Sequence, residues 1–397
     1  MSKSDISRRI RELRQQRGLS QAQLAKPELS DSYISLIESG NRPPTPTALE
    51  IIARKLNCSV DYLVRGVESE EIKRIEKDLE SARQALQNGA KDKARKLYKD
   101  ILSEPSIAQL PDQRHAAEYG LALATEACGD LDEAIRILLK LRGDQTRSLS
   151  DEIRIGSALA LSRCHRDRGE IDQAINVAER EVAAMIEKGW TDHLIELGAT
   201  LLAAYFERGD LLRAEQYAAQ LLAAAEELGT PRAIVATNWN AAILAEYKGQ
   251  YEEALTRIER AWEIQSVVGE PRNRARLHSE YISIRLRVRP EEAAACRDEL
   301  FQVEQELRAT AASTVDLAYC KYLLCRAEIE LGHAEAAVEY ALDSIRLIEE
   351  TNAGMLAESQ VFLARAYQML NRVDEAARAL KAAAEALAKE PTNRLTA

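Results

Sequence analysis

The chain has 397 residues, of which 46% are hydrophobic, 30% charged and only 5% aromatic. This length exceeds one ordinary domain, and the apolar fraction excludes a wholly disordered chain. The charge is uneven, because residues 1–65 contain 11 Lys and Arg against 7 Asp and Glu, whereas the whole chain has a net charge of −10. A cationic head on an acidic body is typical of a protein whose head meets phosphate groups.

Residues 6–65 contain five short predicted helices separated by polar turns. The first covers 6–16, where apolar residues recur at helical spacing until Gly18. Ser20 is expected to cap the second helix, 21–25, and Ser30 the third, 31–38. The fourth covers 47–56 and the fifth lies around 60–63. In the third helix, Ile34 and Ile37 are expected to point into the core.

This stretch resembles the Xre/Cro–C1 family of helix-turn-helix regulators. The matching residues are Leu19-Ser20-Gln21-x-x-Leu24-Ala25, Leu29-Ser30-x-Ser32-Tyr33-Ile34-Ser35-x-Ile37-Glu38-x-Gly40-x-Arg42-x-Pro44, Leu49 to Leu56 and Val60-Asp61-Tyr62-Leu63. One departure is the turn after Ala25, which is one residue shorter than usual and contains Pro27. The resemblance implies binding to double-stranded operator DNA and an internal ion pair between Arg14 and Glu38.

In such folds the third helix enters the major groove, and its N-terminal residues meet base edges. The candidates for base contacts are Asp31, Ser32, Tyr33 and Ser35. For Asp31 an alternative remains open, because an acid in the first turn of a helix stabilises the helix dipole whatever else it touches. The candidates for phosphate contacts are Gln21, Asn41 and Arg42. Because one short helix covers little of a binding site, we expect a homodimer on an inverted repeat.

From about residue 70 a Gly-x-x-x-x-Ala signature recurs every 40 residues. The five clearest copies are Gly89/Ala94, Gly129/Ala134, Gly169/Ala174, Gly209/Ala214 and Gly249/Ala254, and three weaker ones are Arg289/Ala294, Gly332/Ala337 and Asn371/Ala376. The Gly or Asn is expected to end one helix in a left-handed cap, and the Ala to lie where the next helix crosses closely. Equal spacing of this kind predicts a helical solenoid.

These units resemble tetratricopeptide repeats, although the usual period is 34 residues. Repeats joined to such a head are similar to the architecture of peptide-sensing bacterial regulators of the quorum-sensing type. The fold predicted is all-α, with a five-helix head followed by a right-handed tetratricopeptide-like solenoid. The expected domains are a DNA-binding domain over 1–66, about eight helix pairs over 67–390 and a flexible tail over 391–397.

A stack of helix pairs is expected to present a concave groove lined by the first helix of each pair. Counting from the signature, the candidates for this groove are Tyr119, Arg163, Arg166, Phe206, Asn240, Ile243, Tyr247, Ser279, Ser283 and Arg326. Asn240 is singled out because an amide pairs with both polar groups of an extended peptide backbone. The alternative for each is an ordinary solvated face. His165 and the indoles of Trp239 and Trp262 are expected to pack inside the repeats.

No motif of a nucleotide-binding loop, a zinc protease or a serine hydrolase occurs, so we expect no enzymatic activity. The six cysteines form no Cys-x-x-Cys pair, and neither a metal site nor a cofactor is expected. The absence of a signal-like or membrane-spanning run favours a cytoplasmic protein with no membrane partner. Two interpretations of the repeats stay open: a groove that binds a peptide or other effector, or an adaptor and dimerisation platform without a small ligand.

Overall fold

A computed structural model describes residues 3–143, 149–269, 271–310, 314–348 and 353–388. These residues form α-helices joined by turns and three short 3-10 helices, and no strand occurs among them. The all-α prediction is therefore confirmed. None of the helices in these ranges is long and apolar enough to cross a membrane.

The N-terminal 65 residues form five helices, at the positions that the sequence predicts. They are α1 (Lys3–Gln16), α2 (Gln21–Ala25), α3 (Asp31–Glu38), α4 (Pro46–Lys55) and α5 (Val60–Arg65). The side chains of Ser20, Ser30 and Thr45 cap α2, α3 and α4 by accepting hydrogen bonds from backbone N–H groups. Ile34 and Ile37 are fully buried in a core that residues of this head alone supply, as predicted.

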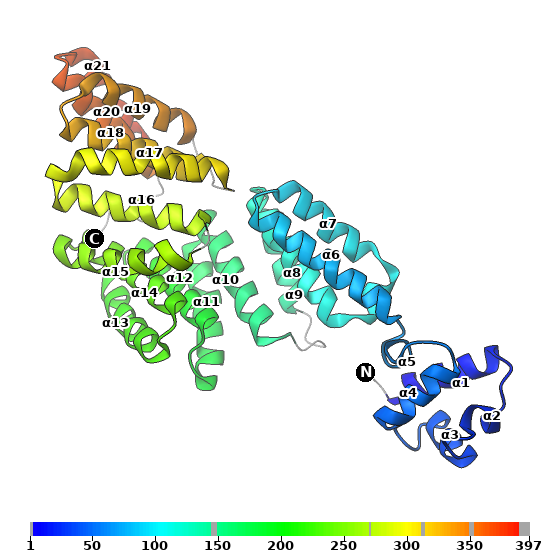
Figure 1. Cartoon of the computed structure of the whole chain (residues 1–397). Helices are drawn as coiled ribbons and strands as arrows, with labels where there is room; N and C mark the ends of the chain where they lie inside the picture. The colour runs from blue at the N-terminus through cyan, green and yellow to red at the C-terminus, as the bar shows by residue number, and fades with distance from the viewer. Residues whose placement is uncertain (1–2, 144–148, 270, 311–313, 349–352, 389–397) are drawn as a thin grey trace. The chain divides into compact units, whose positions relative to one another are not determined.

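The rest of the described chain forms helical hairpins (Figure 1). The first helices of the pairs are α6 (Ser69–Gln87), α8 (Pro111–Ala127), α10 (Asp151–Asp167), α12 (Asp192–Glu207), α14 (Pro231–Tyr247), α16 (Pro271–Val288), α18 (Thr314–Glu330) and α20 (Ala353–Met369). The second helices are α7 (Lys91–Ser103), α9 (Leu131–Gly143), α11 (Ile171–Met185), α13 (Leu211–Leu228), α15 (Tyr251–Val268), α17 (Ala293–Ala309), α19 (Ala334–Ile348) and α21 (Val373–Ala388).

The repeated signature has the conformation that the sequence predicts. Its glycines at 89, 129, 169, 209, 249 and 332 have φ between 74° and 85°, and Asn371 has φ 58°. This left-handed conformation ends each first helix and suits glycine best. The alanines at 94, 134, 174, 214, 254 and 337 have no exposed surface, because a larger residue would push the crossing helices apart.

One copy of the signature departs from the prediction. Arg289 is not left-handed, since a 3-10 helix at Pro290–Glu292 replaces the usual turn. In consequence Ala293, and not Ala294, is buried at the start of α17. The predicted register is therefore wrong by one residue in this repeat.

The chain divides into two compact units. The first comprises Met1–Leu86, Lys91–Glu133 and Gly143–Leu149, and the second Gln87–Ala90, Ala134–Arg142 and Ser150–Ala397. In the first unit the head core and a core between α6, α7 and α8 are separate. In the second unit overlapping clusters run from α10 to α20, because Tyr281 and Phe362 each pack against two of them. The domain boundary after residue 66 stays a prediction.

Candidate functional site

The α3 helix presents an exposed polar face on the head. Ile34 and Ile37 anchor its other face in the core, which leaves Asp31, Ser32 and Ser35 exposed. The Oγ atoms of Ser30 and Ser32 lie 3.2 Å apart at the start of the helix. Short hydroxyl and carboxylate side chains on an exposed helix face can exchange hydrogen bonds with base edges.

Tyr33 fixes the loop that follows α3. Its phenol oxygen accepts a hydrogen bond of 3.1 Å from the backbone N–H of Thr45. The guanidinium of Arg42 lies over the Tyr33 ring, 5.0 Å from its centroid, and the Arg42 side chain is exposed. A cation over an aromatic face is held in place without losing its charge. Asn41 lies beside it and donates to Ser39 Oγ at 2.9 Å.

Arg14 and Glu38 form the internal ion pair that the family resemblance implies. Arg14 Nε and Nη2 donate to the two carboxylate oxygens at 2.6 and 2.9 Å, and only 4% of the Glu38 side chain is exposed. Burial alone would raise the pKa of Glu38, but hydrogen bonds from Arg14 and Gln21 hold it below its ordinary value. The Gln21 amide nitrogen donates to Glu38 at 2.9 Å, so this nitrogen is committed inside the head.

Lys55 holds the turn between α2 and α3, which the sequence did not reveal. From the last turn of α4 its ammonium donates to the carbonyl oxygens of Leu24 and Ala25, both at 3.1 Å, and to that of Lys26. It also pairs with Glu28 at 2.7 Å and thereby lowers the pKa of that carboxyl. These contacts satisfy carbonyl groups at the end of α2 and position the turn. The only signal in the sequence is a basic residue in the last turn of α4.

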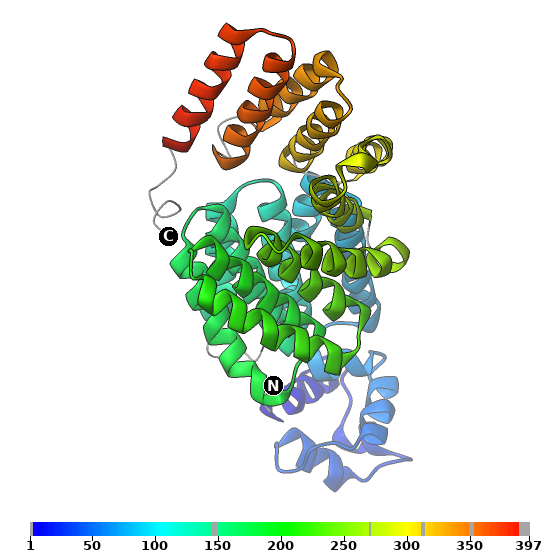
Figure 2. The same cartoon turned by 90° about the vertical axis from the view of Figure 1, so that its left-hand side faces the viewer.

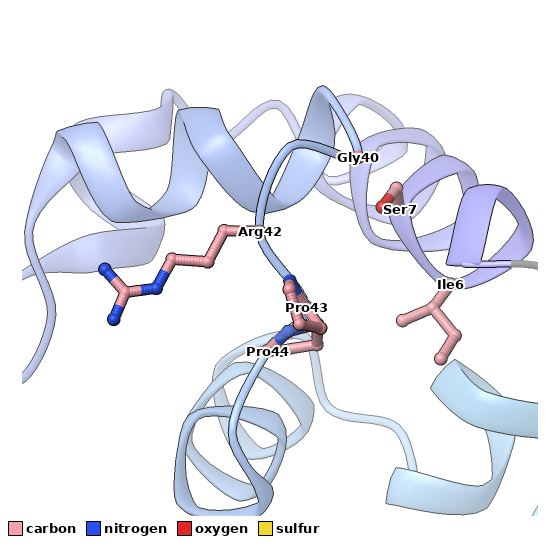
Figure 3. Close-up of a pocket in the computed structure, with 6 residues that line it drawn as sticks. All are labelled: Ile6, Ser7, Gly40, Arg42, Pro43 and Pro44. Atoms are coloured by element: carbon pink, nitrogen blue, oxygen red, sulfur yellow. The ribbon is translucent and has the colours of Figure 1, made fainter.

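A small hollow lies beside the loop after α3 (Figure 3). Ile6, Ser7, Gly40 and the two prolines Pro43 and Pro44 line it, while the Arg42 side chain extends away from them. Its volume of about 30 Å³ has room for a water molecule but not for a larger ligand. Within the described ranges, no group of three or more His, Cys, Asp or Glu could hold a metal ion.

In the repeats, four candidates for the groove lie on α12 and α14. The rings of Phe206 and Tyr247 are perpendicular with centroids 4.8 Å apart, and Tyr247 is 59% exposed. Asn240 is half-buried, and its Nδ2 donates to the Ala236 carbonyl of the same helix at 2.9 Å. Among the described residues none donates a hydrogen bond to its Oδ1, so this oxygen can accept from a ligand. Ile243, on the same helix, is half-buried.

The remaining half-buried candidates lie on α8 and α10. Arg166 pairs with Glu207 of α12, with Nε donating to Oε2 at 3.1 Å. Arg163 is half-buried on the same helix. Tyr119 is half-buried on α8 and belongs to the first compact unit, whereas the other candidates belong to the second.

Three candidates are not available on the surface, and for them the groove prediction is wrong. Ser279, Ser283 and Arg326 are only 2%, 4% and 8% exposed. Ser279 Oγ donates to the Ala275 carbonyl at 3.1 Å, and Arg326 Nη1 donates to Ser283 Oγ at 3.0 Å. For Ser279 and Ser283 the count fails because the turn after α16 lacks the glycine that sets the register. Arg326 precedes the left-handed Gly332 and is buried by its contact with α16. These side chains join α16 to α18.

A polar network that the sequence did not reveal extends from this contact. The phenol of Tyr319, on the same helix as Arg326, donates to Glu280 of α16 at 3.0 Å. Burial raises the pKa of the Glu280 carboxyl to about 7, the Tyr319 bond opposes this rise, and Glu246 adds to it. Because the turn after α16 lacks the glycine that sets the register, a count from the signature does not identify Glu280.

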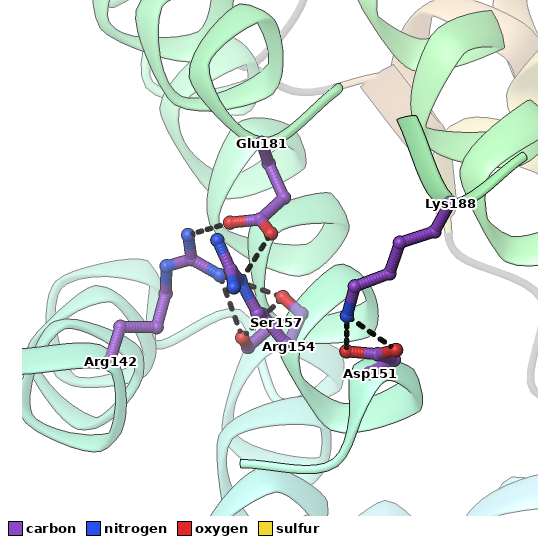
Figure 4. Close-up of polar contacts among 6 residues, drawn as sticks. All are labelled: Arg142, Asp151, Arg154, Ser157, Glu181 and Lys188. Atoms are coloured by element: carbon purple, nitrogen blue, oxygen red, sulfur yellow. Dashed lines mark hydrogen bonds and ion pairs between the residues drawn. The ribbon is translucent and has the colours of Figure 1, made fainter. Parts of the chain in front are cut away.

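A second polar cluster joins α9, α10 and α11 (Figure 4). The carboxylate of Glu181, whose side chain is 3% exposed, accepts from Arg142 Nη2 and lies near Arg154 Nε, both at 2.6 Å. Arg142 Nη1 also donates to Ser157 Oγ at 3.0 Å. Two arginines balance the charge of one buried carboxylate, so the cluster joins these helices.

The cysteines and His165 are structural. Cys164, Cys296, Cys320 and Cys325 are buried, and all six thiols are free. Burial raises the pKa of Cys320 and Cys325 to about 12, which keeps these thiols protonated and unreactive. His165 is 5% exposed and its Nδ1 lies 2.6 Å from Glu170, so it is a packed core residue as predicted.

Comparisons with known proteins agree with this division into a head and repeats. A helix-turn-helix family model matches residues 10–63. The competence pilus inhibition repressor of Acinetobacter baylyi is 43% identical over 60 residues, which are 15% of this chain and 54% of the repressor. The match thus spans about half the length of that curated relative. The head is a helix-turn-helix domain of the Xre/Cro–C1 type.

The repeats share their fold with solved structures. A Rap protein complexed with Competence and Sporulation Factor has a TM-score of 0.58 at 12% identity, covering 81% of this chain and 99% of that one. The apo form of the quorum sensor NprR from B. thuringiensis has a TM-score of 0.56 at 15% sequence identity. The match covers 86% of this chain and 96% of that one. NprR in complex with its cognate peptide NprX has a TM-score of 0.50 at 16% sequence identity. The match covers 70% of this chain and 79% of that one. At these identities the likeness shows the fold, a tetratricopeptide-like solenoid.

Proposed function

We propose that this chain, with its helix-turn-helix head and tetratricopeptide-like body, is a sequence-specific DNA-binding transcriptional regulator. The observation that carries the proposal is the exposed face of α3, which presents Ser32 and Ser35, together with the exposed guanidinium of Arg42 that lies over the Tyr33 ring of the same helix. Hydroxyl groups on the helix supply base contacts and the cation supplies a phosphate contact. Asp31, Gln21 and Asn41 belong to the same proposed interface.

We infer that the repeats receive the regulatory signal, as a peptide or another effector bound at Asn240 and the Phe206–Tyr247 pair. An amide oxygen two helical turns before Tyr247, the member of the aromatic pair on the same helix, suits an extended chain with an apolar side chain. The likeness to NprR, of which one structure contains its cognate peptide, supports a peptide as the ligand. Neither part of this assignment involves catalysis.

Selection of binding sites from a random DNA library by the full-length protein tests the first proposal. We expect a defined sequence to emerge, and Ser32→Ala to change preference at one base pair by roughly 1–3 kcal/mol. Recovery of DNA without a common sequence would contradict sequence-specific regulation. An equal loss of affinity for every sequence would make Ser32 a backbone-positioning residue.

The effector proposal is tested by adding a library of synthetic peptides and measuring affinity for the selected DNA. Asn240→Ala is compared with Asn176→Ala, which changes an exposed asparagine on α11, a second helix. We expect an active peptide to shift the affinity of wild type and Asn176→Ala but not of Asn240→Ala. Equal responses in all three proteins would place the peptide site away from Asn240. The absence of any response to a peptide would favour the adaptor function, in which the repeats dock another protein.

A further inference from the structure

Leu36 is the one large apolar side chain that is exposed among the described residues 5–67 of the head. It is 40% exposed on α3, whereas the other large apolar residues in this range are buried or half-buried. Figure 2 shows the head as the group of short helices at the blue, N-terminal end of the chain. A single exposed leucine is common on protein surfaces, so its exposure alone assigns no role. Its position on α3 is more informative.

Leu36 lies on the face of α3 that points away from the core of the head. Successive residues of an α-helix are rotated by about 100°, so residues four apart lie on one face. Ile34 and Ile37 define the buried face of α3. Ser32 and Leu36 lie near the opposite direction, with Ser35 beside them, and all three are exposed. The centre of the exposed face therefore presents a hydroxyl group and, one turn further on, an apolar group.

The backbone at Leu36 is held by the loop that presents Arg42. The Leu36 carbonyl accepts hydrogen bonds from the Arg42 backbone N–H and from the Ser39 hydroxyl, both at 3.1 Å. The Arg42 guanidinium lies over the Tyr33 ring of the same helix. The apolar group and the cation proposed for a phosphate contact are thus fixed to one short segment. A helix docked on DNA through Arg42 therefore presents Leu36 in a defined position.

The major groove offers one apolar group to such a side chain. The base edges there present hydrogen-bond donors and acceptors, and the exception is the 5-methyl group of thymine. Leucine has no polar group in its side chain, so against any other base edge it leaves a donor or acceptor without a partner. Against a thymine methyl it removes apolar surface of both groups from water.

We propose that Leu36 contacts the 5-methyl group of a thymine and thereby makes a T·A pair part of the DNA sequence that the protein prefers. The inference rests on the proposed function, because it requires α3 to enter the major groove. Four residues of an α-helix rise about 6 Å, and neighbouring base pairs are about 3.4 Å apart. The thymine is therefore expected one or two base pairs from the position that Ser32 contacts.

Exchange of single thymines for deoxyuridine in the selected DNA tests the contact in the full-length protein. Deoxyuridine pairs with adenine as thymine does and lacks only the 5-methyl group. A buried CH₂ group contributes ~0.8 kcal/mol and ~1.4 kcal/mol is tenfold in affinity, so we expect one exchange to weaken wild-type binding about fourfold. In Leu36→Ala, which removes the contacting group, the same exchange is expected to leave the affinity unchanged.

The comparison of two DNAs within each protein separates the contact from any effect of the substitution on the fold. The matched control is Leu212→Ala, which truncates a 68% exposed leucine on α13, outside the head. It is expected to show the same loss as wild type. Exchanges that affect wild type and Leu36→Ala equally at every thymine would overturn the proposal.

A second variant changes the preference instead of removing the contact. Leu36→Gln replaces the apolar group by an amide, which pairs with the N6 and N7 groups of adenine. Selection from a random DNA library with this variant is expected to lose the thymine at that one base pair and to keep the rest of the sequence. Selection of the wild-type sequence without change would contradict the contact.

The inference and the proposed function can fail separately. A defined selected sequence with no thymine that depends on Leu36 overturns the contact and leaves the regulator intact. If no common sequence emerges, deoxyuridine replaces thymine throughout random DNA. A loss of wild-type affinity that is absent in Leu36→Ala then supports the contact and contradicts sequence-specific regulation, whereas equal affinities overturn both.

Discussion

Replacing Glu280 with glutamine is expected to stabilise the contact between α16 and α18 at neutral and alkaline pH. The carboxyl of Glu280 accepts from Tyr319 at 3.0 Å, and a glutamine oxygen can accept the same bond. Burial is the main cause that raises the pKa of Glu280, and the neighbouring carboxylates Glu246 and Glu358 add to it against the opposing effect of Arg276. Glutamine at this position has no negative charge and has nearly the same shape as the glutamate side chain.

The size of the effect follows from the pKa. It rises from its ordinary 4.5 to about 7, and each pKa unit corresponds to ~1.4 kcal/mol, so ionisation destabilises the fold around Glu280 by about 3 kcal/mol. Because the folded state holds this proton more tightly than the unfolded chain, the stability that Glu280 contributes is fully present below pH 4.5 and is lost by about pH 7. Glu280→Gln should therefore match wild type at pH 4.5 and exceed it at pH 8.

Hydrogen exchange of peptides from α16 and α18, corrected for the intrinsic rate at each pH, measures this locally. A local measurement is needed because repeat arrays do not always unfold in one step. The control is Glu252→Gln, which changes an exposed glutamate on α15 and is expected to follow wild type. Equal pH dependence of wild type and Glu280→Gln, or lower protection of Glu280→Gln at pH 8, would refute the reasoning.

Three further outcomes are expected. Glu38→Gln should destabilise the head by about 3 kcal/mol, because it leaves the nearly buried Arg14 without its anion. Hydrogen exchange of peptides from α1 to α5, measured at rising temperature, checks this. Gly120→Ala should cost about 1–3 kcal/mol in denaturant unfolding, because its methyl group would collide with the Tyr98 ring, whereas Gly143→Ala meets nothing within 4 Å and should be neutral. Arg42→Ala should weaken binding to all DNA sequences and reduce the slope of log affinity against log salt by about one; an unchanged slope would remove it from the phosphate contacts.

The head was predictable because its information is local. Serine caps, turn residues and the apolar pattern around Ile34 and Ile37 determine five helices within 60 residues. The pairing of Arg14 with Glu38 came from the family resemblance and not from spacing. Which of the exposed residues on α3 contact bases stays a prediction, since the free head contains no information on how a base approaches Ser32.

The 40-residue period of the repeats was predictable from the sequence. Which residues of each helix are exposed and which are buried was harder to predict. A left-handed glycine marks the end of a helix, and Gly249 has this conformation after α14 as predicted. That Asn240 and Tyr247 line a groove stays a prediction. The 3-10 turn after Arg289 shifts the register of the signature by one residue. Counting back from the signature therefore assigned the buried Ser283 to the surface. Pairs such as Arg166 with Glu207 join residues 41 apart, and no local pattern identifies such partners.

The position of Lys55 has a consequence for how the head tolerates change over evolution. The short turn around Pro27 is held from outside by an ammonium that reaches three successive carbonyl groups and also pairs with the carboxylate of Glu28. Substitutions of the other side chains in the turn can therefore be accommodated as long as α4 keeps its cation. We expect a change at Lys55 to alter the tilt of α3 while every residue on the α3 face stays the same. Inherited differences in DNA preference can therefore originate in α4, outside the proposed base-contacting helix.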